Sequence, residues 1–74
     1  MSRGSETSLW VGARIKLLRK KAGLTQEKLA ELSGIDYKHI QLLEGKNPTD
    51  LRVDNLKKIC DALDVSLSEF FERF

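Results

Sequence analysis

The sequence predicts an all-α fold, a compact domain built from five helices. Apolar residues recur at the spacing of a helix face through most of the chain. Residues that cap or end helices separate these apolar stretches. No segment alternates with the two-residue period of a strand over a useful length. The 74 residues are enough for one such domain and too few for a second.

The first helix is expected to follow a flexible N-terminal tail. Residues 1–7 show no helical periodicity and are assigned to this tail, and the domain is assigned to residues 8–74. Thr7 or Ser8 can cap the helix. Its apolar stripe has the i, i+4, i+7 and i+11 spacing of one helix face and consists of Val11, Ile15, Leu18 and Ala22. Gly23 supplies the left-handed stop.

Two short helices joined by a tight turn are expected next. Thr25 is suited to cap a helix over residues 26–33, and Asp36 one that runs to about residue 44. Gly34 tolerates the positive φ that the turn between them requires. Ala30 is small where the second helix crosses the first, and Leu32 is available for the interior. Two helices joined in this way form a helix-turn-helix.

The last two helices follow a loop that contains Asn47–Pro48, a strong turn signal. The fourth helix is marked by an apolar stripe of Val53, Leu56, Ile59, Cys60 and Leu63. Ser66 and Glu69 form the capping box of a fifth helix. Its stripe consists of Leu67, Phe70, Phe71 and Phe74, so that this helix is expected to reach the end of the sequence.

Composition excludes several classes of protein. The longest apolar run is far shorter than the ~20 residues of a membrane-spanning helix, so no membrane is expected as a partner. One cysteine excludes a disulfide framework, and no Cys/His cluster or glycine-rich phosphate loop indicates a metal, a cofactor or an enzyme. Cys60 is expected in the core and His39 on a helix surface. A reducing cytoplasm is the expected location.

Charge is distributed unevenly although the net charge is only +2. Residues 14–28 contain six basic side chains and one acid, whereas residues 60–74 contain four acids and one base. This asymmetry is what a domain with one anion-binding face would show, and it is also compatible with an ordinary solvated helix surface.

The segments GLTQEKLA (23–30), SGI (33–35) and IQLLEGK (40–46) resemble the phage repressor and Cro-type (XRE-like) helix-turn-helix family. Residues 56–59 and 62–71 resemble the fourth and fifth helices of the same fold. The resemblance implies a DNA-binding transcriptional regulator, a repressor or a controller protein. It implies a homodimer on an inverted-repeat operator in double-stranded DNA, with no cofactor and no small-molecule ligand. The alternatives are a protein-interaction module, such as an antitoxin-like partner binder, and the DNA-binding domain of a longer regulator.

The resemblance places the third helix in the major groove of DNA. Its outward positions, which would read bases, are Tyr37, Lys38, Gln41 and Leu42. Lys38 can donate to guanine, Gln41 can pair with adenine, and Leu42 can contact a thymine methyl group. A solvated helix face is the alternative for Lys38 and Gln41, and packing on a neighbouring loop is the alternative for Tyr37. Asp36 is interpreted first as a helix cap rather than a cytosine contact.

Further roles follow from the same resemblance. Contacts to the DNA phosphates are expected from the start of the second helix and from the loop after the third, at Gln26, Lys46, Asn47, Thr49 and Arg52. This loop is longer than is usual in the family, and Arg52 stands where a Ser or Thr cap is expected. Arg19 and Glu44 are expected to form a partly buried structural ion pair, with two independent surface charges as the alternative.

The aromatic C-terminus is a candidate dimer interface, with Phe70, Phe71 and Phe74 as contacts. Trp10 and Leu17 form a second apolar edge on the first helix. A domain of this size has limited interior for four large aromatic side chains. The alternative is that this edge and the phenylalanines fill one another within a single chain.

Overall fold

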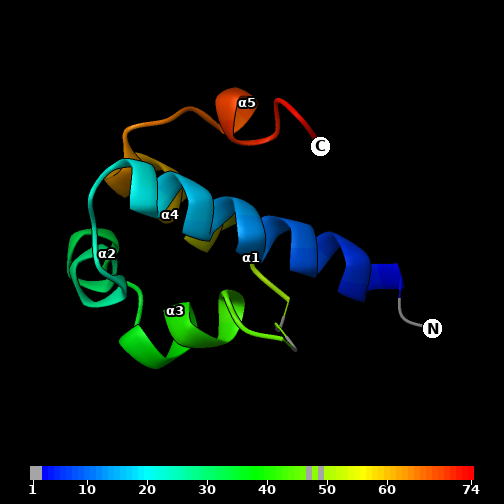
Figure 1. Cartoon of the computed structure of the whole chain (residues 1–74), viewed down its shortest axis with the longest axis horizontal. Helices are drawn as coiled ribbons and strands as arrows, with labels where there is room; N and C mark the ends of the chain where they lie inside the picture. Colours follow the sequence, from blue (N-terminus) through cyan, green and yellow to red (C-terminus); the bar gives the residue numbers. More distant parts are fainter. Residues whose placement is uncertain (1–2, 47, 49) are drawn as a thin grey trace.

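The computed structural model describes residues 3–46, 48 and 50–74. Over these residues the chain forms five helices and no strand, so the predicted all-α class is confirmed. The helices are α1 (Arg3–Lys21), α2 (Gln26–Ser33), α3 (Tyr37–Leu43), α4 (Val53–Leu63) and α5 (Leu67–Phe70). Helix α1 is the longest and crosses the molecule, with α2 and α3 on one side and α5 on the opposite side (Figure 1).

Helix α1 begins earlier than the sequence predicted. Residues 3–7, which the sequence pattern assigns to a tail, are the first residues of the helix, and residues 1–2 of that tail lie outside the described part. Each residue added to an existing helix gains a backbone hydrogen bond without a new nucleation step. Glu6 also lies in the first turn, where a carboxylate interacts favourably with the helix dipole.

The turn between α2 and α3 has the chemistry that the sequence predicted. The side chain of Thr25 accepts a hydrogen bond from the backbone N–H of Lys28 at 3.0 Å, and Asp36 accepts one from Lys38 N–H at 3.2 Å. Gly34 has φ 76°, a left-handed conformation that costs a glycine little. Thr25 thus fixes the start of α2, and Gly34 and Asp36 fix where α2 ends and α3 begins.

The core lies where all five helices converge. It is centred on fully buried apolar side chains, one or more from each helix: Ile15, Leu29, Ile40, Ile59, Cys60 and Phe70. Burial raises the pKa of the Cys60 thiol, which keeps it neutral. Leu32 departs from the prediction, since half of it is exposed on the outer face of α2. The buried face of α2 consists of Leu29, Ala30 and Ser33. Leu32 lies beside this face and points toward solvent, which explains the difference.

Helix α5 is shorter than the sequence predicted and ends at Phe70. The cause is Arg14 on α1, whose Nε and Nη2 donate to the backbone carbonyls of Phe70 and Glu69 at 2.8 and 2.9 Å. Arg14 thereby binds the carbonyls that a continued helix would use. The chain closes instead with tighter turns, in which Phe74 N–H donates to Phe71 O at 3.0 Å.

Within the described residues, no helix is long and apolar enough to cross a membrane. Nor do the described side chains include a group of three or more His, Cys, Asp or Glu residues that could hold a metal ion.

Candidate nucleic-acid interface

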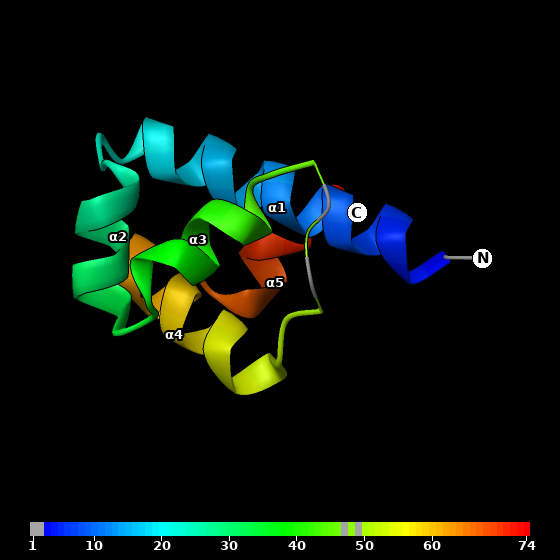
Figure 2. The same cartoon turned by 90° about the horizontal axis from the view of Figure 1, so that it is seen from below.

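Helix α3 has one buried face and one exposed face. Ile40 and Leu43 are buried at 0% and 2% exposure and attach the helix to the core. All four predicted base-reading residues lie on the exposed side: Tyr37, Lys38, Gln41 and Leu42. Figure 2 shows α3 on the viewer's side of the molecule, with α1, α4 and α5 around and behind it. The outer face of α3 is therefore open to a large partner.

Two of these exposed side chains are already ordered relative to each other. Gln41 Nε2 donates a hydrogen bond to Tyr37 Oη at 3.2 Å, across one turn of α3. The hydroxyl proton of Tyr37 and the side-chain carbonyl of Gln41 are not used in this bond. Together they present a donor and an acceptor on the surface of the helix. Hydrogen-bonding groups of this kind read the edges of bases in the major groove.

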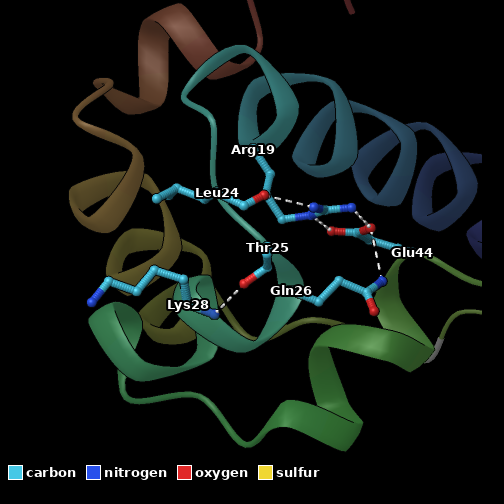
Figure 3. Close-up of polar contacts among 6 residues, drawn as sticks. All are labelled: Arg19, Leu24, Thr25, Gln26, Lys28 and Glu44. Atoms are coloured by element: carbon cyan, nitrogen blue, oxygen red, sulfur yellow. Dashed lines mark hydrogen bonds and ion pairs between the residues drawn. The ribbon is translucent and has the colours of Figure 1, made fainter.

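The end of α3 is held by a polar network (Figure 3). Arg19 from α1 donates from Nε to Glu44 Oε2 at 2.8 Å and from Nη2 to Glu44 Oε1 at 2.9 Å. The ion pair expected from the family resemblance is thus present, and the two side chains are only 9% and 2% exposed. Arg19 Nη1 also donates to the backbone carbonyl of Leu24 at 2.8 Å. The hydrogen bond with Glu44 raises the pKa of Arg19, so this guanidinium stays charged.

Helix α2 joins the same network through Gln26. Its Nε2 donates to Glu44 Oε1 at 3.0 Å, so a single carboxylate ties α1, α2 and the end of α3 together (Figure 3). Gln26 is also the first residue of α2, a position where backbone N–H groups and the helix dipole favour an anion. The residue expected to contact phosphate therefore also braces the helix that carries the predicted base-reading side chains.

The other predicted phosphate contacts are less closely tied to α3. Lys46 is exposed just beyond the end of α3. Arg52 is the N-cap residue of α4 and makes no side-chain capping bond. Its side chain is 82% exposed, and its guanidinium lies 3.8 Å from the carboxylate of Asp54. Asn47 and Thr49, the remaining two predictions, lie outside the described residues.

Trp10 and the three phenylalanines form one aromatic cluster on the other side of α1. Trp10 stacks on Phe71 with centroids 5.7 Å apart and meets Phe70 and Phe74 edge-on at 6.0 and 4.9 Å. Phe70 is completely buried, so its assignment to a dimer interface is wrong: it belongs to the core of a single chain. Phe71 is half-buried, and Phe74 is 67% exposed.

Two residues with a structural part in this arrangement carry no strong signal in the sequence. Arg14 ends α5, as described above, and a basic residue on an amphipathic helix gave no signal of that role. Gly12 lies in the interior of α1, where glycine costs about 1 kcal/mol relative to alanine. That cost is the one signal in the sequence that could have pointed to Gly12, and it does not say which element the glycine faces.

The fold and the exposed, braced second helix of the α2–α3 pair define a helix-turn-helix domain. Residues 15–70 match the helix-turn-helix family, and the chain belongs to that family. The family predicted from the sequence is confirmed.

Several relatives in this family are regulators. An uncharacterized HTH-type transcriptional regulator of Sinorhizobium medicae is 42% identical over 62 residues, which cover 84% of this chain and 44% of the relative. The HTH-type transcriptional regulator PuuR of Escherichia coli is 34% identical over 67 residues, which cover 90% of this chain and 36% of PuuR. The chain thus spans less than half the length of these two relatives.

Among solved structures, the chain is similar to the restriction-modification controller protein C.Esp1396I. The structure of C.Esp1396I bound to a 19 base pair DNA duplex has 37% sequence identity to this chain and a TM-score of 0.82. The match covers 88% of this chain and 85% of the controller chain.

Proposed function

We propose that this protein is a non-enzymatic transcriptional regulator that binds a specific sequence in double-stranded DNA. The observation that carries the proposal is the outer face of α3. It presents Tyr37, Lys38, Gln41 and Leu42 on a helix whose other face is buried. A helix of this width fits the major groove, and these side chains offer the donors, acceptors and apolar group that distinguish base pairs there.

The likeness to C.Esp1396I supports this assignment, because that protein has been solved on a DNA duplex and the match covers most of both chains. We therefore favour a repressor or controller of transcription, acting in the cytoplasm. In this assignment Gln26, Lys46 and Arg52 contact the DNA backbone, which positions the protein without reading sequence. Asn47 and Thr49 remain part of the same proposal from the sequence alone.

The protein is further proposed to bind as a homodimer. Phe74 is a large aromatic side chain that remains 67% exposed although it packs on Trp10 and Phe71. Phe71 also lines an open, mainly apolar hollow of about 460 Å³ with Val11, Leu51, Val53 and Leu56, and Val53 is 70% exposed. Apolar surface of this extent on a small domain favours a protein interface. A two-fold dimer would set two α3 helices ~34 Å apart, on half-sites about 10 base pairs apart.

The test is selection of bound DNA from a random duplex pool by the purified chain, followed by sequencing. We expect an inverted repeat to be enriched, and we expect the affinity for the enriched site to fall as salt rises, because phosphate contacts release counterions. The matched control is the double variant Lys38→Ala/Gln41→Ala, which changes only exposed side chains of α3 and should lose the enrichment while keeping its fold.

Absence of enrichment at moderate salt, together with no salt-dependent affinity for random DNA, would overturn the proposal. The exposed aromatic surface would then direct attention to a protein partner. Enrichment of a single half-site would support base reading and contradict the dimer.

A further inference from the structure

Gly12 brings the backbones of α1 and α3 into direct contact. A Cβ atom at this position would lie 1.9 Å from the carbonyl oxygen of Leu43 and 3.0 Å from its carbonyl carbon. Cβ atoms essentially never approach another heavy atom to less than 3.0 Å. Both neighbours are backbone atoms, so they cannot turn away as a flexible side chain could. The two helices can approach this closely only because residue 12 has no side chain.

The contact is made at the end of α3. Leu43 is the last residue of α3, where backbone carbonyls lack partners within the helix. The hydrogen that replaces a Cβ at Gly12 is directed at this carbonyl, an arrangement typical of weak Cα–H···O contacts between closely packed helices. The contact therefore determines how deep the end of α3 sits against α1.

Arg19 provides a second attachment on the same side of α1. It lies seven residues, or about 10 Å, beyond Gly12, which is close to two full turns. Its ion pair with Glu44 holds the residue that follows Leu43. The fully buried Ile15 lies between the two attachments and packs into the core. Helix α1 thus fixes two consecutive residues at the end of α3, one by close backbone contact and one by charge.

We propose that Gly12, with Arg19, is a positioning residue that sets where the base-reading face of α3 stands relative to the rest of the domain. The inference rests on the proposed DNA-binding function. A methyl group at residue 12 would force the end of α3 outward by about 1 Å or more to restore an allowed contact. Hydrogen bonds to base edges form only over donor–acceptor distances of about 2.7–3.2 Å. Long side chains such as Lys46 can adjust to a displacement of this size when they contact phosphate.

The first experiment compares Gly12→Ala with wild type on two duplexes, the site enriched by selection and a scrambled version of it. We expect the ratio of the two affinities to fall roughly tenfold or more, which is the discrimination carried by one good base contact. Affinity for the scrambled duplex should change less than about twofold, because phosphate contacts supply it. The control is Cys60→Ala, which removes buried volume on α4 and should keep the wild-type ratio.

A second measurement follows α3 without DNA. Backbone amide NMR spectra of Gly12→Ala should show shifts concentrated in residues 40–45, whereas Cys60→Ala should shift mainly α4. If Gly12→Ala fails to fold, Arg19→Lys tests the other attachment, since it keeps the charge but loses the paired hydrogen bonds. We expect Arg19→Lys to lower the affinity ratio as well.

A folded Gly12→Ala with the wild-type ratio would overturn the inference, as would an unchanged ratio in Arg19→Lys where Gly12→Ala does not fold. These results are distinct from failure of the proposed function. If the wild type itself does not distinguish the two duplexes, the DNA-reading proposal fails; if it does and the variants match it, only the positioning role fails.

Discussion

Arg19 on α1 and Glu44 at the end of α3 are joined by two hydrogen bonds of 2.8 and 2.9 Å, and their side chains are only 9% and 2% exposed. The paired geometry satisfies both carboxylate oxygens, and Gln26 adds a third hydrogen bond to one of them. Because both charges are buried, each depends on the other. Loss of one partner leaves the other charged and without its counterion.

We expect Arg19→Met and Glu44→Gln each to lower the free energy of unfolding by about 3–5 kcal/mol, the range for breaking a buried pair. The double variant should cost less than the sum of the two, because neither charge is then left alone. Urea unfolding of the four proteins measures this coupling. The control is the exposed pair Lys57–Asp61, for which alanine variants should couple by about 1 kcal/mol or less. Absence of coupling between Arg19 and Glu44 would contradict the structural role.

Gln41 is expected to determine base preference. Gln41→Ala removes a side chain that can make two hydrogen bonds with adenine, so discrimination at one base pair of each half-site should fall by about 1–3 kcal/mol. The measurement is competition between the enriched site and single-base variants of it. Affinity for random DNA should stay close to wild type. A uniform loss on all sequences would instead place Gln41 among the phosphate contacts.

Lys46 is expected to act in the opposite way. Lys46→Ala should weaken binding to the enriched and scrambled sites by a similar factor, because a phosphate contact carries no sequence information. The dependence of log affinity on log salt should become shallower by about one unit for each lost contact. Lys57→Ala, on an exposed face of α4, serves as the matched loss of one positive charge. A change in base preference on mutation of Lys46 would show that it reads sequence.

Much of the fold could be predicted because its determinants are local. Thr25, Asp36 and Ser66 cap their helices as their positions indicated, and the bounds predicted for α2, residues 26–33, agree with the structure. The error in α5 has a long-range cause. Helix α5 ends early because Arg14, more than fifty residues away in sequence, binds its carbonyls. No pattern within residues 66–74 contains that information.

The candidate site likewise has some features that follow from local sequence and others that depend on contacts between distant residues. Exposure of the α3 face follows from helical periodicity, and the Arg19–Glu44 pair could be expected from the family resemblance. Periodicity could not show which phenylalanines of the aromatic cluster are buried, because Phe70 and Phe71 are adjacent on the same predicted stripe. Only the folded structure, in which Phe70 enters the core, shows that Phe70 is buried while Phe74 remains exposed. The contact at Gly12 depends on a distance between two helices, which periodicity does not give.

The capping box of α5 should give the domain part of its acid sensitivity. Ser66 N–H donates to Glu69 Oε1 at 2.8 Å, and Glu69 N–H donates to Ser66 Oγ at 3.0 Å. The backbone hydrogen bond from Ser66 is the main cause that lowers the pKa of Glu69 below its ordinary value. A carboxyl group with a lowered pKa in the folded state stabilises that state above its unfolded pKa, and the contribution disappears as the pH falls through the folded pKa.

Glu69→Gln should therefore lower the melting temperature near pH 7 and lower it less at acid pH, where the wild-type carboxyl group becomes protonated. Thermal unfolding at both pH values measures the difference, and Glu72→Gln, an exposed acid in the turn after α5, is the control. Ser66→Ala should cost about 1 kcal/mol through loss of the cap. An equal effect of Glu69→Gln at both pH values would show that the charge is not involved.

Variants at Phe74 and Phe70 should have different effects, the first on dimerisation and the second on folding. Phe74→Ser changes a side chain that is 67% exposed, so the domain should remain folded while self-association weakens roughly tenfold or more, as for a residue central to an interface. Phe70→Ala leaves a cavity in the core and should cost about 3–5 kcal/mol of folding free energy. Sedimentation over a range of micromolar concentrations measures association, and circular dichroism measures folding. Leu32→Ser is the matched control, since Leu32 is 51% exposed on α2 and belongs to no aromatic cluster.

A wild type that sediments as a monomer at these concentrations, or a Phe74→Ser variant that associates as strongly as wild type, would exclude the C-terminal aromatic surface as the dimer interface.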